Sequence, residues 1–169
     1  PIIRSFAIMT KIDFIYSRGI IMTLAKIVYA SMTGNTEEIA DIVAEALENL
    51  GLEVEINECT QVDASDFEDA DLCIVATYTY DEGQLPDEIM DFYDDLGELD
   101  LSGKIFGVCG SGDTFYDFYC KAIDDFEESF LKTGAKKGAS SVKVDLAAEE
   151  EDIQNLEAFA KELVESLNG

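Results

Sequence analysis

Three short segments carry residue types that could hold a ligand, and the first of them suits a phosphate. It is the run Ser31-Met32-Thr33-Gly34-Asn35-Thr36, with three hydroxyl groups, one side-chain amide and a series of backbone N–H groups. Where such a run leads into a helix, the free N–H groups and the helix dipole both favour an anion. The same residues could simply cap the helix. The run lacks the Gly-Lys-Ser/Thr ending of an ATP-binding loop, which argues against nucleotide triphosphate hydrolysis.

The second segment could supply flat surfaces for a planar ring. It reads Thr77-Tyr78-Thr79-Tyr80-Asp81-Glu82-Gly83-Gln84-Leu85-Pro86. Its two tyrosines could stack on a ring or pack against the protein itself. The composition of this segment alone leaves both interpretations open.

The third segment combines glycines with another tyrosine. It begins with Gly110-Ser111-Gly112-Asp113 and continues through Tyr116 to Cys120. The glycines let the backbone approach a ligand closely, and Asp113 could accept a hydrogen bond from a ring N–H or cap a helix. A dinucleotide fingerprint is excluded because its third glycine position holds Phe115.

These segments lie between alternating strand and helix patterns. Five β-rich runs are predicted as strands, at residues 25–31, 52–57, 71–77, 104–110 and 141–146. The intervening stretches place apolar residues at helical spacing, with predicted buried faces that include Leu50, Met90 and Ile153. The third helix is expected over about 118–132, and the last one follows the fifth strand directly.

Strands separated by helices imply a parallel sheet covered on both faces. We expect one α/β domain with a doubly wound five-stranded sheet of order 2-1-3-4-5. In such sheets ligands bind beyond the carboxyl ends of the strands, at the switch in strand order. The loops after strands one, three and four meet there, so the three segments should form one site for a mononucleotide with a large planar ring.

Charge sets the class of partner. The chain has 169 residues and a formal net charge of −26. Residues 1–21 hold three basic residues and one acid, and we interpret them as a leader outside the domain of residues 22–169. From Met22 onward, 8 basic and 36 acidic residues give 8 − 36 = −28. This charge argues against nucleic acid and anionic membranes, and favours partners with basic surfaces.

Cysteine and histidine usage limits the chemistry further. The four cysteines show no paired metal-binding spacing, and Cys73 and Cys109 lie in apolar strand patterns. We expect reduced thiols in a reducing compartment, the cytoplasm. The absence of histidine excludes His-dependent catalysis and His metal sites.

Taken in order, the three segments resemble the flavodoxin family over residues 22–169. The Ser31–Thr36 run resembles the family's FMN phosphate loop, and the other two segments resemble its two isoalloxazine loops. The fifth strand leads into the last helix without an insertion, which resembles the short-chain members of the family. The position of FMN at the switch in strand order follows here from the resemblance.

The resemblance also implies a role for each residue. The phosphate would be held by Ser31, Met32, Thr33, Gly34, Asn35, Thr36 and Thr77. The ring would be covered by Tyr80 on its inner face and Tyr116 on its outer face, with Asp113 at its pyrimidine end. Backbone contacts would come from Tyr78, Thr79, Ser111 and Gly112. The predicted site also includes Asp81 and Gly110, and Phe118 and Cys120 at the dimethylbenzene or ribityl side.

One departure from the family pattern concerns the second loop. Many members place a glycine after the inner aromatic, whereas this chain has Asp81-Glu82. A positive φ costs more for a residue other than glycine.

The resemblance implies a low-potential one-electron carrier rather than an enzyme. Its donor would be a flavodoxin reductase and its acceptor a low-potential enzyme, both with basic surfaces. We expect a monomer, because nothing in the sequence indicates an oligomer. One alternative is a flavoprotein activator or FMN-dependent reductase of the same fold. A second is a phosphoacceptor receiver domain, which needs acids where this chain has Ser31 and Thr77. A third is an interaction domain that has lost its flavin.

Overall fold

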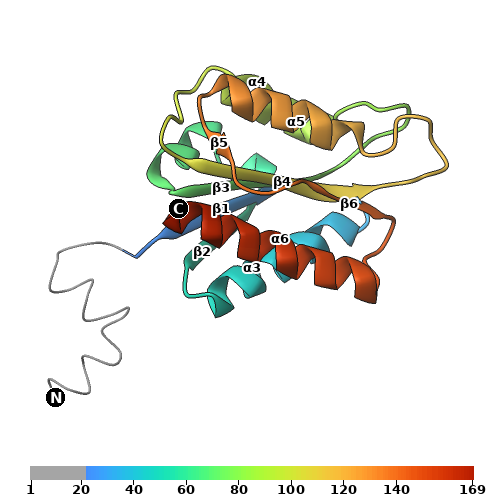
Figure 1. Ribbon diagram of the computed structural model, residues 1–169. Helices are drawn as coiled ribbons and strands as arrows, with labels where there is room; N and C mark the ends of the chain where they lie inside the picture. Colours follow the sequence, from blue (N-terminus) through green and yellow to red (C-terminus); the bar gives the residue numbers. More distant parts are fainter. Residues whose placement is uncertain (1–21) are drawn as a thin grey trace, which may run out of the picture.

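The computed structural model describes residues 22–169, and its centre is a parallel sheet with helices on both faces (Figure 1). The leader predicted at residues 1–21 lies outside the described residues. The strands are β1 (Leu24–Tyr29), β2 (Glu53–Glu58), β3 (Leu72–Tyr78), β4 (Ile105–Gly112), β5 (Lys136–Lys137) and β6 (Val142–Asp145).

The sheet has the order β2-β1-β3-β4-β5, with β6 also paired to β4, and every pair is parallel. The predicted order is confirmed. The fifth strand, however, comes in two segments rather than the single run predicted. Residues 138–141 stand opposite only two residues of β4, Gly107 and Val108. The extra residues fold Ala139 into the core, and a side chain at Gly138 would lie 2.4 Å from Ile105.

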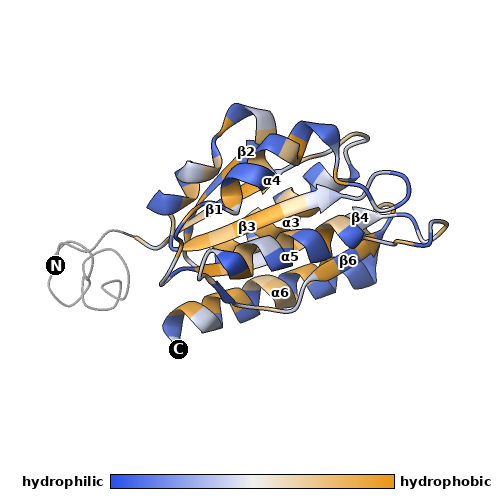
Figure 2. Ribbon diagram, turned by 90° about the horizontal axis from the view of Figure 1, so that it is seen from above, coloured by the Kyte–Doolittle hydropathy of each residue, from blue (hydrophilic) through white to orange (hydrophobic). Residues whose placement is uncertain are grey.

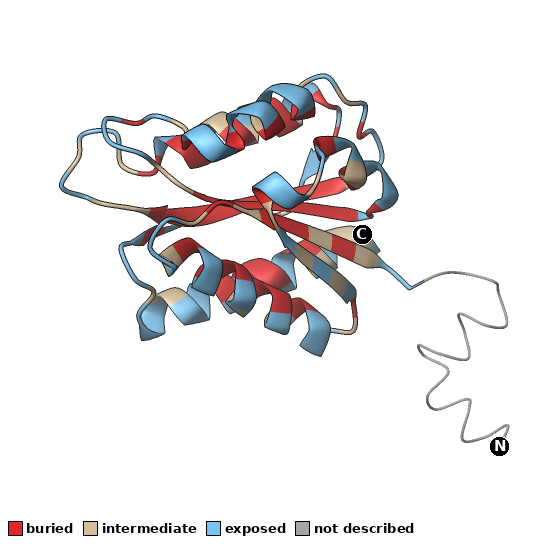
Figure 3. Ribbon diagram, turned by 180° about the vertical axis from the view of Figure 1, so that it is seen from behind, coloured by how far each residue is buried: buried red, intermediate tan, exposed pale blue. Residues whose placement is uncertain are grey.

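Two helices cover each face of the sheet. Figure 1 shows α3 (Asn35–Asn49) and α6 (Glu150–Asn168) below it, and α4 (Met90–Leu96) and α5 (Lys121–Lys132) above it. Residues 22–169 also form three short 3₁₀ turns: η1 (Cys59–Gln61), η2 (Ala64–Asp69) and η3 (Asp87–Ile89). The helices bury their inner faces and expose their outer ones (Figure 3). The sheet therefore has a separate apolar core on each side.

The central strand β3 is buried almost along its whole length, as its continuous apolar sequence predicts. In Figure 2 the β3 ribbon is hydrophobic over most of its length and turns pale toward its arrowhead. On the α5 side, Phe106 and Phe130 stack with ring centroids 4.6 Å apart. A rigid core thus fixes the edge at which β1, β3 and β4 end.

The predicted helix faces need three corrections, because Leu50, Met90 and Ile153 are exposed. Met90 follows the 3₁₀ turn η3, which has three residues per turn and shifts the phase of the helix. Phe92 is buried in its place. Leu50 and Ile153 lie at the ends of their helices, where fewer residues pack across a side chain.

Candidate functional site

A cavity of about 230 Å³ opens where the loops after β1, β3, β4 and β6 meet, at the carboxyl edge of the sheet. All three segments singled out in the sequence contribute to its wall. Its lining consists of Met32, Thr33, Asn35, Thr36, Tyr78, Thr79, Tyr80, Asp81, Ser111, Gly112, Asp113, Tyr116 and Leu146.

The first loop leaves the start of α3 open to a ligand. Gly34 is the N-cap, with φ +97°, and no side chain of the described residues caps this helix. At α6, by contrast, Glu149 closes the helix start with a capping box. The Ser31 hydroxyl accepts a hydrogen bond from the Gly34 N–H at 3.1 Å, which shapes the turn. The first-turn N–H groups of α3 are therefore available to an anion.

A buried hydrogen bond joins the first loop to the third. The Thr36 and Ser111 hydroxyl oxygens lie 2.8 Å apart, with the two residues 1% and 5% exposed. Both line the cavity. The helix start is thereby fixed relative to the end of β4.

The second loop is a tight turn in which Tyr80 and Gln84 exchange two backbone hydrogen bonds of 2.8 Å. Asp81, within the turn, has φ +48°, so this chain adopts the left-handed conformation without a glycine at that position. Tyr80 is 49% exposed at the mouth of the cavity. The loop is tied down by Thr79, whose N–H donates to the Ser111 carbonyl and whose hydroxyl accepts from the Ala122 N–H.

The Tyr78 hydroxyl is engaged in a hydrogen bond within the protein. It donates to a Glu88 carboxylate oxygen at 3.1 Å. Desolvation and the nearby Glu88 charge raise the pKa of Tyr78 to about 12. Tyr78 is thus a neutral part of the cavity wall at physiological pH.

The glycines of the third loop are needed for close backbone approach within the protein. A Cβ on Gly110 would lie 1.7 Å from the Thr77 carbonyl oxygen, and one on Gly112 would lie 2.8 Å from the Cys120 sulfur. Asp113 accepts from the Phe115 N–H at 2.9 Å, so it caps a turn inside the loop rather than the start of α5.

Some predicted site residues lie around the cavity rather than on its wall. Thr77 is fully buried beneath it, with its hydroxyl donating to the Tyr78 carbonyl. Phe118 packs beside Gly83, and the buried Cys120 precedes α5, which starts three residues later than predicted. The others that do not line the cavity are Ser31, Gly34 and Gly110.

The sequence interpretation did not include Leu146, which follows β6 and lines the cavity. Its N–H donates to the Gly112 carbonyl at 2.8 Å, and its φ is +62°. A leucine rarely adopts positive φ, so no motif marks the position. Only the alignment of β6 with β4 brings it to the site.

The cavity is weakly acidic and has no cationic side chain among the described residues on its wall. Its charged residues are Asp81 and Asp113, so a phosphate here would rely on neutral donors and the α3 dipole. Within residues 22–169, no cluster of His, Cys, Asp or Glu is arranged to hold a metal ion. All four cysteines are free and buried, and burial raises the pKa of each thiol.

None of the described helices is long and apolar enough to span a membrane.

Comparison with known proteins points to the flavodoxin family. The family model for flavodoxins matches residues 27–159. The chain is 41% identical over 142 residues to probable flavodoxin 2 of Bacillus subtilis (strain 168), covering 82% of this chain and 94% of that protein.

Solved structures of high similarity lead to the same family. A flavodoxin of Streptococcus pneumonia TIGR4 is 68% identical, with a TM-score of 0.83 and coverage of 85% of this chain and 99% of that one. A short-chain flavodoxin associated with a bacterial microcompartment is 50% identical, with a TM-score of 0.85 and coverage of 86% and 99%. This chain therefore belongs to the flavodoxins, which bind FMN, carry electrons between redox partners and are not enzymes.

Proposed function

We propose that the cavity at the carboxyl edge is the FMN site of this protein, with the phosphate at the start of α3 and the ring near Tyr80 and Tyr116. The observation that carries this proposal is the convergence of an uncapped helix start and two tyrosines on one cavity. An anion and a flat ring, joined by a polar chain, match those two ends.

The residues present fit the phosphate by chemistry and by backbone shape. Thr33, Asn35 and Thr36 offer neutral side-chain donors on the cavity wall. A Cβ on Gly34 would meet nothing within 4 Å, so a ligand can approach the backbone there. Leu146, which was not among the predicted site residues, adds an apolar surface to the cavity wall.

Bound FMN supplies the one-electron chemistry, and the protein supplies binding and electrostatics. Carboxylates around the cavity oppose any negative charge added within it. One such charge about 10 Å away costs roughly 0.4 kcal/mol at the dielectric constant of water, before screening by salt. Many carboxylates acting together favour electron release at low potential.

The same charge selects the partners. With a formal net charge of −26, the protein should dock reductases and acceptors that present basic surfaces. We infer a flavodoxin reductase as donor, a low-potential enzyme as acceptor, and a monomer in the cytoplasm. Relatives that this chain covers over about nine tenths of their length carry the name flavodoxin, which favours a carrier over an activator or a substrate-reducing enzyme.

The experiment for the site compares FMN with riboflavin, which lacks the phosphate. Titrations of the FMN-free protein followed by flavin fluorescence should show FMN binding more tightly. Thr33→Ala should weaken FMN by about tenfold, as expected for one hydrogen bond to a charged group, and leave riboflavin unchanged. Tyr116→Leu should weaken both ligands.

Thr23→Ala, on the exposed chain before β1, is the matched control and should alter neither affinity. Equal loss of FMN and riboflavin affinity in Thr33→Ala would place the phosphate elsewhere. For the partners, electron transfer from a flavodoxin reductase should slow as salt rises. A rate independent of salt would refute electrostatic docking.

A further inference from the structure

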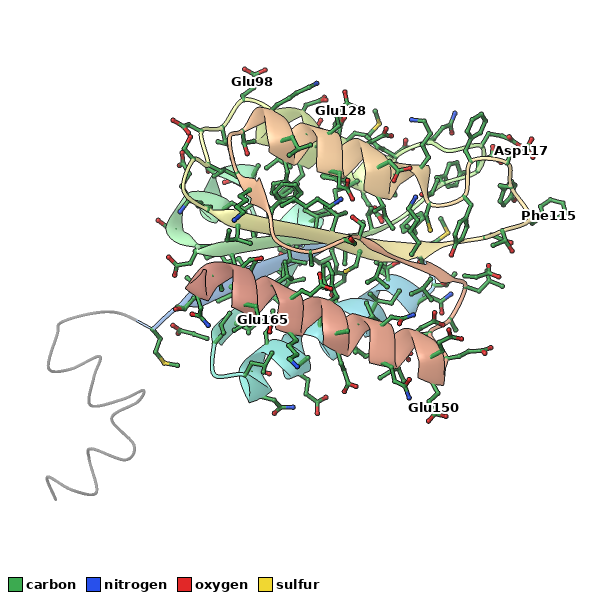
Figure 4. All side chains as sticks on the ribbon, in the orientation of Figure 1. Glu98, Phe115, Asp117, Glu128, Glu150 and Glu165 are labelled. Carbon is green, nitrogen blue, oxygen red and sulfur yellow. The ribbon has the colours of Figure 1, made fainter. Side chains whose placement is uncertain are left out.

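The loop between β4 and α5 presents a phenylalanine to solvent at its tip. Phe115 is 83% exposed, the highest value among the large hydrophobic side chains of residues 22–169. Figure 4 shows it projecting from the outer turn of this loop, away from the sheet and near Asp117. Leaving a phenylalanine in water forgoes the stabilisation that its burial would give. Burial of this side chain in a partner's surface would provide that stabilisation.

The backbone beneath Phe115 is held in place. The N–H and hydroxyl of Thr114 donate to the two carboxylate oxygens of Asp145, at 3.2 and 3.1 Å. The Phe115 N–H donates to Asp113 at 2.9 Å. Because this stretch of backbone is already held by hydrogen bonds, binding through Phe115 costs little additional backbone entropy, which favours affinity.

Phe115 is also linked to the cofactor cavity. Its ring meets Tyr116 edge-on, with centroids 5.3 Å apart and planes at 90°. Tyr116 lines the cavity, as does Leu146, which is 51% exposed. A protein that covered Phe115 would therefore also cover the mouth of the cavity.

The charges around Phe115 indicate what covers it. Asp113, Asp117 and Asp145 lie on the same loop or hold it in place. A second copy of this chain would bring an equal net charge of −26 toward these carboxylates, which opposes self-association. A positively charged partner is attracted instead. The ring then needs an apolar recess on that partner.

We propose that Phe115 is the anchor of the docking surface for the electron-transfer partner, and that it enters an apolar pocket bordered by Lys or Arg on that protein. This inference rests on the proposed docking to basic-surfaced redox proteins. The proposal adds an uncharged residue, so its contribution to partner affinity can be measured separately from that of electrostatic attraction. Aromatic side chains seated in a partner's pocket commonly dominate the binding energy of an interface.

The test uses the FMN-loaded protein and a flavodoxin reductase as the probe donor. Phe115→Ser should lower the second-order rate of electron transfer at least tenfold, with Phe115→Leu retaining most of it. The dependence of the rate on salt should keep the same slope, because the charge is unchanged. Reduction by dithionite and FMN affinity should stay at the wild-type values.

The control is Leu131→Ser, which removes another exposed apolar side chain, 56% exposed and near the end of α5. It should behave as the wild type. A rate within twofold of wild type for Phe115→Ser would overturn the anchor while leaving salt-dependent docking intact. No transfer from the reductase to the wild type would overturn the proposed docking and the anchor with it. A wild-type dimer that Phe115→Ser converts to a monomer would assign the residue to self-association and refute the proposal.

Discussion

The hydrogen bond between Thr36 and Ser111 should hold the first and third loops of the site together before any cofactor binds. Its two oxygens are 2.8 Å apart, and both residues are almost fully buried. Thr36→Val keeps the side-chain shape and leaves the Ser111 hydroxyl without this partner. Ser111→Ala does the reverse. A buried polar group that loses its partner costs about 1–3 kcal/mol of stability.

Replacing both partners removes the unpaired group, so the double variant should cost less than the two single variants combined. We expect the difference, which is the coupling energy, to be about 1 kcal/mol or more. The assay is urea unfolding of FMN-free protein, because bound cofactor would add its own stabilisation. Thr23→Val, at an exposed site, should change the free energy of unfolding by less than about 0.5 kcal/mol.

Additive losses would refute this reasoning. If the double variant loses the sum of the single losses to within about 0.5 kcal/mol, the two hydroxyls do not interact in solution. The loops would then be positioned by the sheet alone.

Three further outcomes are expected. Gly110→Ala should lose about 3 kcal/mol or more of stability in urea, because its Cβ would lie 1.7 Å from the Thr77 carbonyl oxygen. Gly103→Ala, with φ +87° and open space, should lose only about 1–2 kcal/mol, and equal losses would contradict the steric argument. The pKa of Tyr78 is raised from about 10 to about 12 in the folded protein, so its contribution to stability is lost as pH rises through that range. In Tyr78→Phe, the free energy of unfolding should therefore fall less steeply between pH values of about 10 and about 12. Sodium chloride should raise the thermal midpoint of the FMN-free protein by screening its net charge of −26, and an unchanged midpoint would show that self-repulsion is negligible.

The sheet order and the meeting of the three loops could be predicted because they depend on local patterns. Continuous apolar runs mark buried parallel strands, and the loops that follow them share one edge. The division of the fifth strand could not be predicted in the same way. Lys136 and Lys137 are polar and lie between two glycines, and their pairing with β4 depends on contacts distant in sequence.

The positions of residues that depend on long-range strand pairing could also not be predicted from the sequence. Leu146 reaches the cavity only because β6 aligns with the end of β4, and Thr77 lies beneath the cavity because Gly110 lets the two strands approach. The role of Asp113 depended on the path of its loop, since a carboxylate can cap a turn as readily as a helix.

Among residues 22–169, backbone strain is concentrated at the carboxyl edge of the sheet, around the cavity. In residues 22–169, the non-glycine residues with positive φ are Asp81, Cys120 and Leu146. Two of them line the cavity, and the third touches the backbone that does. At about 1–2 kcal/mol each, they cost roughly 3–6 kcal/mol, a large share of the stability of a typical domain. The two apolar cores must provide enough stability to outweigh that cost. The strained backbone then persists around the cavity, where its shape forms part of the wall that a ligand would contact.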